Sequence, residues 1–395
     1  MHNVVIDKPY EFIPPHRGRW WPWFLQRLMR RRLRREYGLV RIECQGGERL
    51  RASVQSGDSV LIAPNHCRPC DPEVVQEVAR QLGVLPFILA SWHLFMQNRF
   101  QSFMLRRVGA FSIYREGMDR AAIAAAIEIL VTGDRPLVIF PEGVISRTND
   151  RLNELQEGTA FIARSAAKKR AKTDGSGRVV VYPMAIRYHY DGEVREAVTP
   201  VLAEIERRLS WRPQLHLSLE ERIQKLGRAL LTLKEHEYLG ESQVGTAGER
   251  IQRLIDAMLT PLEQEWLHGE RAASVVARVK RLRAAVLPDM VQSELSESER
   301  ERRWLQLANM YLAQQLSCYP PEYLADRPTP ERWLETAERF EEDLTDRCRP
   351  YSPLRAVVMV GEEIAVSPTR DRSAADDPLM VEIERQLKQM LGVKP

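Results

Sequence analysis

A histidine and an aspartate five residues apart, His66 and Asp71, are the residues whose types and spacing first indicate chemistry. His66 follows the apolar run 59–63, which predicts a buried strand. Side chains that leave the carboxyl end of such a strand reach the crevice in which open α/β sheets bind ligands. A histidine there can act as a general base near neutral pH when a carboxylate holds its other nitrogen, and Asp71 is within reach.

The same two residues also have a structural explanation. Asp71 stands before Pro72, which is the pattern of a helix N-cap followed by proline in the first turn. Histidines near strand ends are common in any α/β domain. The residues around His66 therefore leave catalysis and helix capping both open.

Further polar residues and prolines stand at the ends of later predicted strands. A short strand is expected at 111–114, another at 137–140 and a third at 179–186. The carboxyl ends of parallel strands meet at one edge of a sheet, so the residues there form one candidate site. The residues concerned are Arg115, Glu142, Gly143, Ser146, Arg147 and Pro183.

In this order the residues resemble the four sequence blocks of the glycerolipid acyltransferases, which include glycerol-3-phosphate and 1-acylglycerol-3-phosphate acyltransferases. The resemblance covers about residues 40–190 and extends more weakly to 354–366. The blocks are Asn65-His66 with Asp71; Gly109, Phe111 and Arg115; Phe140-Pro141-Glu142-Gly143 with Ser146-Arg147; and Pro183.

The resemblance implies an acyltransferase of phospholipid biosynthesis. His66 would remove the proton of an acceptor hydroxyl, and Asp71 would orient the histidine. The donor would be an acyl thioester, either acyl-CoA or acyl-carrier protein, and the acceptor a glycerophosphate or lysophospholipid. A thioester is already activated, so a base, positioning and carbonyl polarisation suffice, and no cofactor is expected.

The acceptor would be held by residues of the second and third blocks. An arginine fork suits a phosphate, and a hydroxyl with nearby backbone adds hydrogen bonds. One departure from the family bears on the acceptor: Val144-Ile145 stands where phosphate-acceptor members have Thr-Arg. Arg147 or Arg115 would then compensate, or the acceptor would be another lysolipid or an amphiphilic alcohol. The residues expected to bind the acceptor are Arg115, Glu142, Gly143, Ser146 and Arg147.

Cysteine use is sparse, with five residues at positions 44, 67, 70, 318 and 348. This pattern indicates a reducing compartment rather than a disulfide framework. Cys67 and Cys70 form a C-x-x-C, but no second pair follows to complete a zinc site, so no metal is expected. A covalent route through one of these two thiols is an alternative to direct transfer.

Strand and helix signals alternate from about residue 58 to 190, which predicts an α/β fold with a mostly parallel sheet flanked by helices. A helix-periodic stretch almost without strand signals follows. We therefore expect an acyltransferase domain over 39–195 and a large helical insertion over 196–350. The chain returns over 351–395 with a strand pair and a last helix. No internal repeat is expected.

Residues 1–38 are interpreted as a basic amphipathic membrane-association segment. On a helical wheel of 19–36, apolar residues gather on one side and arginines on the other. Such a helix suits an anionic bilayer surface, or it packs its apolar side on the protein's own core. The apolar set is Trp21, Phe24, Leu25, Leu28, Met29 and Leu33; the basic set is Arg27, Arg30, Arg31 and Arg34.

Composition narrows the setting of the protein. A hydrophobic fraction of 44% and a charged fraction of 28% are those of a globular protein, and no apolar run is long enough to span a bilayer. The net charge of +4 argues against a nucleic-acid partner. We expect a peripheral, monotopic protein on the cytoplasmic face of a membrane.

Two other classes of function fit the same residues. The chain could be a non-catalytic membrane-associated scaffold that keeps an acyltransferase-like domain. It could instead be a hydrolase, in which water replaces the acceptor and the thioester or ester is cleaved. A His66→Ala variant separates the first from an enzyme, and product analysis with and without an acceptor separates the second.

Overall fold

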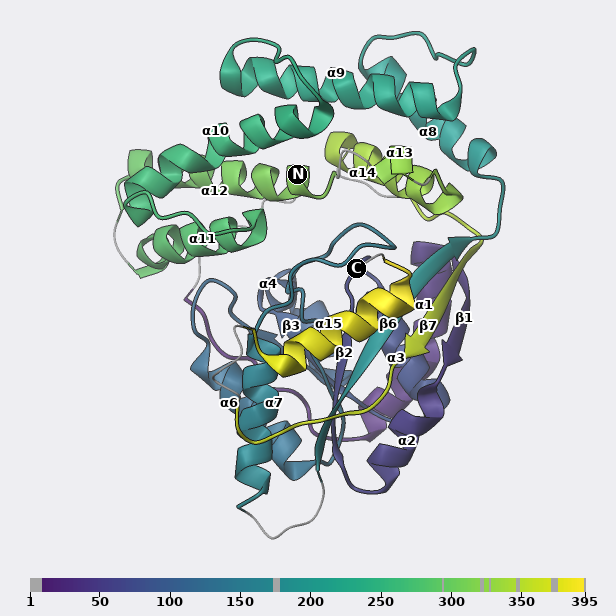
Figure 1. Cartoon of the computed structure of the whole chain (residues 1–395), viewed down its shortest axis with the longest axis vertical. Helices are drawn as coiled ribbons and strands as arrows, with labels where there is room; N and C mark the ends of the chain where they lie inside the picture. Colours follow the sequence, from purple (N-terminus) through teal and green to yellow (C-terminus); the bar gives the residue numbers. More distant parts are fainter. Residues whose placement is uncertain are drawn as a thin grey trace. The chain divides into compact units, whose positions relative to one another are not determined.

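The computed structural model describes residues 9–172, 178–292, 295–319, 323–326, 328–345, 349–370 and 376–393 (Figure 1). The chain divides into two compact units. One, here called the α/β unit, comprises Tyr10–Asp191 and Pro350–Pro395, and the other, the helical unit, contains Gly192–Arg349. The expected domain boundaries remain predictions; their first residues, 1–8, lie outside the described ones.

The α/β unit is built on one sheet whose strand order is β1-β7-β6-β2-β5-β3-β4, with β8 also paired to β6. From β6 to β4 all neighbouring strands are parallel, whereas β7 and β8 run antiparallel to β6. The predicted α/β fold with a mostly parallel sheet is confirmed. The strands are β1 (Leu39–Gln45), β2 (Ser59–Pro64), β3 (Phe87–Ser91), β4 (Ala110–Ile113), β5 (Leu137–Val138), β6 (Val179–Tyr190), β7 (Leu354–Val360) and β8 (Ile364–Ala365).

The central strand β2 is buried along its whole length, as its unbroken apolar sequence requires when helices cover both faces of a sheet. It pairs with β6 from Ser59↔Val179 to Pro64↔Met184, and with β5 at Leu61↔Leu137. The residues that follow β2 and β5 therefore emerge at the same edge, and β6 continues past this edge beside them.

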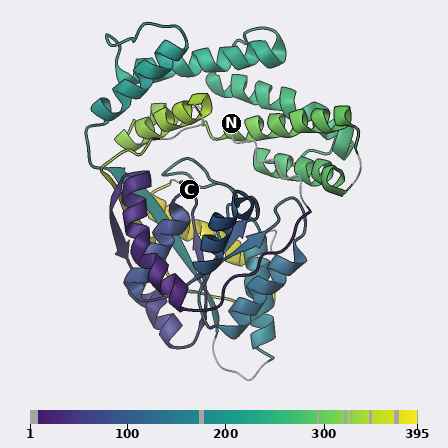
Figure 2. The ribbon, with the colours of Figure 1, turned by 180° about the vertical axis from the view of Figure 1, so that it is seen from behind.

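Helices cover both faces of this sheet. Figure 1 shows α15 in front of it, and Figure 2, seen from behind, shows the long purple helix α1 in front. Helix α6 begins where Asp119 accepts a hydrogen bond from the Ala122 N–H at 2.9 Å, and it ends at Gly133 with φ 69°. The helices are α1 (Trp20–Tyr37), α2 (Gly47–Gln55), α3 (Asp71–Leu82), α4 (His93–Met96), α5 (Arg99–Arg107), α6 (Arg120–Thr132), α7 (Gly158–Arg170) and α15 (Pro378–Leu391).

The apolar side of α1 is divided between the core and the surface, which the helical wheel did not predict. Leu25, Met29 and Leu33 are buried, and α1 packs on α3, β1 and α5. Phe24 and Leu28, assigned to the same stripe, are 39% and 45% exposed. The wheel drew one broad stripe, but the neighbouring elements cover only its inner half.

In the helical unit, every described residue that has regular secondary structure lies in a helix. Its core lies between α9, α10, α11 and α12 and includes Leu254, Leu259, Leu282 and Met310. The helices are α8 (Val194–Arg208), α9 (Leu219–Leu239), α10 (Ala247–Leu267), α11 (Val275–Gln292), α12 (Glu297–Ser317), α13 (Tyr323–Asp326) and α14 (Pro330–Thr345).

An internal repeat runs through the helical unit, so the expectation of none is wrong. The segments 218–226, 246–254 and 274–282 read SLEERIQKL, TAGERIQRL and SVVARVKRL, at intervals of 28 residues. Each segment opens a helix, and its first residue caps that helix: Ser218 and Thr246 accept from the backbone N–H three residues on. The residues at most other positions differ between the three segments, which makes the repeat hard to recognise in the sequence.

The repeated arginine makes the same contact each time. Arg222, Arg250 and Arg278 each bind, through two nitrogens, a glutamate near the end of the preceding helix. The glutamates are Glu206, Glu235 and Glu263, each at most 3% exposed at the side chain. A two-pronged contact of this kind fixes the angle between successive helices, because both side chains must stay planar and in register.

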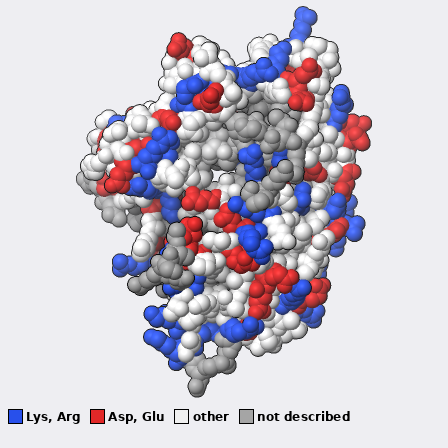
Figure 3. Space-filling view, in the orientation of Figure 1, with Lys and Arg blue, Asp and Glu red and all other residues white. Residues whose placement is uncertain are grey.

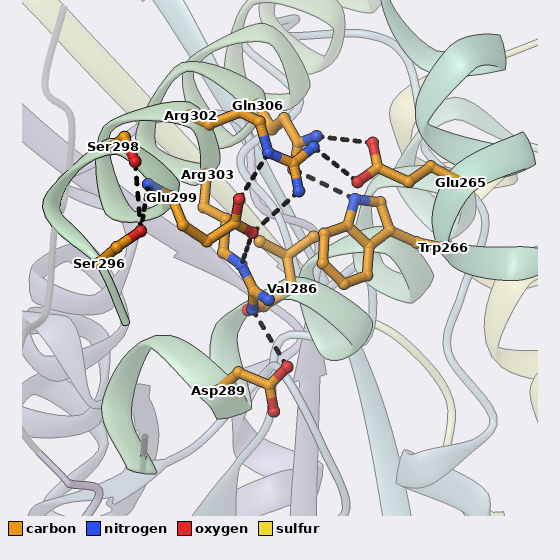
Figure 4. A network of polar contacts seen from close by, with 10 residues as sticks. All are labelled: Glu265, Trp266, Val286, Asp289, Ser296, Ser298, Glu299, Arg302, Arg303 and Gln306. Atoms are coloured by element: carbon orange, nitrogen blue, oxygen red, sulfur yellow. Dashed lines mark hydrogen bonds and ion pairs between the residues drawn. The ribbon is translucent and has the colours of Figure 1, made fainter. Parts of the chain in front are cut away.

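A second polar network joins α10 to α12 (Figure 4). Trp266 donates to Gln306 at 3.1 Å, and Glu265 accepts from Arg302 at 2.6 Å. Arg303 lies beside Arg302 and donates to the Val286 carbonyl of α11 at 3.1 Å. Polar groups buried between these helices are therefore paired.

Candidate active site

His66 and Asp71 meet at the carboxyl end of β2. The His66 Nδ1 atom lies 2.8 Å from Asp71 Oδ2, and the side chains are 11% and 0% exposed. The His66 ring also lies against the Phe140 ring, with 4.4 Å between centroids. With Nδ1 held by a carboxylate and one ring face covered, the imidazole has a fixed orientation, and Nε2 is the ring nitrogen that Asp71 does not contact.

The Asp71 carboxylate accepts hydrogen bonds from the loop that precedes it and does not cap the helix that follows it. Its carboxylate accepts from the Arg68 N–H at 2.8 Å and from the Tyr188 hydroxyl at 2.6 Å. The N–H groups of Glu73 and Val74, which an N-cap would bind, donate instead to the Cys70 carbonyl. The capping explanation of Asp71 therefore does not account for its position, whereas the orientation of His66 does.

Two buried asparagines fasten the site to β6. Asn65 donates to the Ile186 carbonyl at 3.1 Å and accepts from its N–H at 2.7 Å. Asn149 makes the same pair of contacts with Tyr188, at 2.7 and 2.6 Å. Each side-chain amide satisfies backbone groups of β6 that have no strand partner on that side. The loops that carry Asn65 and Asn149 are thereby held at fixed positions along β6.

Glu142 lies beneath the His66 loop and is only 1% exposed. Its Oε1 accepts from the His66 N–H at 2.6 Å and its Oε2 from the Asn153 N–H at 2.9 Å. Burial raises the pKa of Glu142 to about 8, because desolvation outweighs these two donors. Both oxygens of Glu142 thus bind backbone N–H groups, one of them that of His66, and the expected contact of Glu142 with an acceptor stays a prediction.

The segment after Glu142 turns back toward His66. Gly143 has φ 69°, a conformation that glycine adopts without strain, and Arg147 has φ 57°. Ser146 is 4% exposed; its N–H donates to the His66 carbonyl at 2.7 Å and its hydroxyl to the Thr148 carbonyl at 3.1 Å. Ser146 thus also holds the His66 backbone, so the third block supports the histidine from both sides.

Arg115 lies exposed, two residues after β4. In the strand order β2-β5-β3-β4 this strand stands three places from β2, on the order of 14 Å at ordinary strand spacing. The structure therefore places Arg115 at the same edge as His66 but well to one side. An acceptor that touches both would have to be elongated.

The two thiols beside Asp71 are buried. Cys70 Sγ lies 3.4 Å from the Tyr188 hydroxyl, and Cys67 Sγ lies 3.9 Å from Asp71 Oδ1. Burial, with the negative charge of Asp71 second, raises the pKa of Cys70 to about 12. A buried thiol held in its protonated form is a poor nucleophile, so this environment disfavours a covalent route through Cys70. The fifth cysteine, Cys348, lies outside the described residues.

Tyr188 is the site residue that the sequence did not reveal. It is fully buried on β6, and its pKa is raised well above the ordinary value by burial and by the charge of Asp71. A protonated phenol is the form that donates to a carboxylate. Its position five residues after Pro183 gave no signal, because only the pairing of β6 beside β2 brings it to Asp71.

Two structural features are absent from the described residues. Among them, no three or more His, Cys, Asp and Glu side chains are grouped as metal ligands would be. In the same part of the chain, none of the helices has the length and apolar character needed to cross a bilayer.

A parallel sheet with a histidine–carboxylate pair after a central strand, supported by a Pro-Glu-Gly turn from the next strand, defines an acyltransferase type of domain. A comparison with protein families agrees. The model of the acyltransferase family, to which the glycerolipid acyltransferases belong, matches residues 41–187, and these residues form an acyltransferase domain. The predicted resemblance is thereby confirmed. A comparison with curated proteins found no match.

Proposed function

We propose that the protein transfers a fatty acyl group from an acyl thioester to a hydroxyl of a glycerophosphate or lysophospholipid. The contact that carries the proposal is the 2.8 Å pair between His66 and Asp71, within a domain of the acyltransferase family. Acyl-CoA and acyl-carrier protein both present the required thioester, and the chemistry needs no further cofactor.

The reaction follows from the orientation of His66. Its Nε2 takes the proton of the acceptor hydroxyl as that oxygen attacks the thioester carbonyl, and Asp71 stabilises the imidazolium that forms. The C–O bond forms and the C–S bond breaks. The departing thiolate then receives the proton from His66, so the histidine returns to its starting state and no acyl-enzyme is needed.

The acceptor is the less constrained substrate. Glu142 and Ser146 contact the His66 backbone. The proposed cationic contacts for the acceptor's phosphate are Arg115 and Arg147, because a guanidinium can bind a phosphate through two nitrogens. Arg115 stands far along the sheet edge and Val144-Ile145 brings no charge, a combination that favours an elongated acceptor with an apolar part over glycerol 3-phosphate. Such acceptors reside in membranes, so we propose that the enzyme works peripherally on a membrane surface, at its cytoplasmic face.

The test is an acyl-transfer assay with both thioester donors and with glycerol 3-phosphate and several lysolipids as acceptors. We expect His66→Ala to lower kcat by at least about 100-fold, the usual contribution of a general base. His216→Ala, which removes an exposed histidine of the helical unit, serves as the control and should keep wild-type kcat.

Three results would contradict the proposal. Equal activity of wild type and His66→Ala on every acceptor would exclude His66 as the base. Release of free fatty acid at a rate that no acceptor changes would indicate a hydrolase. Full biological activity of His66→Ala would indicate a non-catalytic scaffold.

A further inference from the structure

Aromatic side chains stand exposed on two neighbouring helices of the α/β unit. On α1, Trp20 is 59% and Trp23 48% exposed. On α5, Phe100 is 72% and Phe103 41% exposed. Apolar rings in water carry a free-energy cost, and a gathered set of them marks a surface that binds something.

Ring contacts connect Trp20, Trp21 and Phe24 of α1 with Phe103 of α5. Phe24 stacks on Trp20 with 5.4 Å between centroids, and Trp20 meets Trp21 edge-on at 4.8 Å. Trp21 in turn meets Phe103 of α5 at 5.7 Å. The exposed aromatic residues of α1 therefore continue directly onto α5, and Phe100 extends the cluster by one helical turn.

Arginines border the cluster on both helices. The outer side of α1 continues from its aromatic half into Arg30, Arg31 and Arg34. In α5 the residues at one-turn spacings from Phe103 are Arg99, Arg106 and Arg107, and the helix has no acidic residue. Arg107 also lies over the Trp21 ring at 5.3 Å and the Phe103 ring at 4.8 Å.

The opposite face of the same unit differs. On the side drawn in Figure 3 the acidic and basic side chains of this unit are interspersed. On α15, for example, Arg385 pairs with Glu382 and Lys388 with Glu384. The arginines named above on α1 and α5 contrast with this mixed pattern.

We infer that the face formed by the outer sides of α1 and α5, here the α1–α5 face, binds anionic lipid bilayers. Its rings enter the headgroup boundary while its arginines bind lipid phosphates. Aromatic residues with interspersed arginines are the composition that suits this boundary. A protein partner would need no such excess of positive charge, and a nucleic acid would need fewer exposed apolar rings. The inference deepens the membrane association proposed above by adding α5 and by naming the lipid charge.

The binding site can be tested by sedimentation of the full chain with vesicles of phosphatidylcholine, with and without phosphatidylglycerol. We expect the wild type to bind the mixed vesicles. The double variant Phe100→Ser/Phe103→Ser should bind them about tenfold more weakly, since it loses the burial of two rings. Phe161→Ser, which removes an exposed ring of α7, is the matched control and should bind like wild type.

A separate variant tests whether binding to anionic vesicles requires the arginines. Arg31→Gln/Arg34→Gln/Arg99→Gln should lose the preference for mixed vesicles over pure phosphatidylcholine, because each arginine near an anionic surface adds to the attraction. All these side chains are exposed, so thermal melting of each variant should match wild type. Binding by Phe100→Ser/Phe103→Ser equal to wild type, or a wild type that binds neither vesicle, would overturn the inference. If the wild type is a dimer that binds no vesicles and this variant is a monomer, the face mediates self-association. That result would also overturn the inference.

The outcome is separable from that of the proposed reaction. His66→Ala should bind vesicles like wild type, and Phe100→Ser/Phe103→Ser should keep its activity on a short-chain soluble lysolipid. A wild type that binds mixed vesicles but acylates no acceptor would support membrane binding by the α1–α5 face and contradict the proposed reaction.

Discussion

The Asp71 side chain is fully buried, so its hydrogen-bond donors determine how its carboxylate is oriented. Four groups surround its carboxylate: the His66 ring, the Arg68 N–H, the Tyr188 hydroxyl and the Cys67 thiol. The Tyr188 bond is the shortest of these, at 2.6 Å, and occupies Oδ1, while His66 occupies Oδ2. Tyr188 therefore fixes the plane of the carboxylate that orients the base.

Removal of the Tyr188 hydroxyl tests this positioning role. Tyr188→Phe keeps the buried ring and deletes one hydrogen bond to a charged group, which is worth about 1.5–3 kcal/mol. We expect kcat to fall about tenfold or more with little change in KM, because the carboxylate can rotate while the substrate contacts remain. Steady-state kinetics over a range of pH measure both constants and the profile.

A purely structural role for Tyr188 would give a different result. Thermal stability would then fall while kcat of the folded fraction and its pH profile stayed the same. Tyr182→Phe is the matched control, since its hydroxyl contacts Ser53 and Glu363 away from Asp71.

Glu142 links the site to the pH dependence of stability. Its pKa is raised by burial from 4.5 to about 8, so the unfolded chain releases this proton near pH 4.5 and the folded chain near pH 8. The folded state therefore binds more protons between these values, and the free energy of unfolding falls as pH rises through this window, by up to about 1.4 kcal/mol per pH unit.

Denaturant unfolding of wild type and Glu142→Gln at several pH values measures this contribution. The difference in free energy of unfolding between the two proteins should shrink as pH rises from about 5 to 8, because only wild type carries the titrating group. A difference that is constant over this range would show that Glu142 does not titrate there.

The sequence could predict the contact between His66 and Asp71 but not its surroundings. His66 and Asp71 lie in one loop, and a spacing of five residues is visible without any knowledge of the fold. Tyr188 and Asn149 reach the site through the register of β6, which no local pattern encodes. The backbone contacts of Glu142 could not be predicted for the same reason, since they depend on the N–H groups that the fold turns toward it.

At the scale of elements, the repeated glutamate–arginine contact sets how the helices of the helical unit follow one another. Glu235 is 0% and Arg250 12% exposed at the side chain, and the pair joins the end of α9 to the start of α10. Glu235 also accepts from the Gln243 N–H in the loop between them. Loss of the arginine would leave a buried carboxylate with one donor.

We expect Arg250→Ala to destabilise α9 and α10 by about 3 kcal/mol, the usual cost of breaking a buried ion pair from one side. Replacement of both partners, in Glu235→Leu/Arg250→Leu, should cost less, because no charge is then stranded. Native-state hydrogen exchange of the α9 and α10 amides reports the local free energy. Arg253→Ala, an exposed arginine of α10, is the control. A double variant as unstable as the single one would contradict this account.

Element ends marked by caps were predictable, and those set by distant pairing were not. The last helix, expected within 351–395, runs from Pro378 to Leu391, where Asp377 caps it and Gly392 takes φ 65°. Strand β6 was expected to stop at Ile186 but continues to Tyr190, because β7 pairs with it from Met184 to Tyr190. Its partner lies far along the chain, beyond any local signal.

In the whole molecule, strands from the first and the last parts of the sequence build the sheet, whereas the acyltransferase family model matches only residues 41–187. Strands β7 and β8, which follow the helical unit, add to β6 outside that match. The matched segment is thus an incomplete sheet by itself. Its edge at β6 is covered by strands from the last part of the sequence.

The pairing of β6 with β7 also constrains the order of folding. Tyr190 lies opposite Leu354, and the whole helical unit is translated between them. During synthesis β7 therefore emerges only after the helical unit, and until then β6 has unpaired backbone groups along that edge. A helical unit that folds on emergence shortens the loop that this pairing must close and lowers its entropy cost. Rapid local folding of the repeats would in this way shorten the interval in which the nascent sheet is open to aggregation.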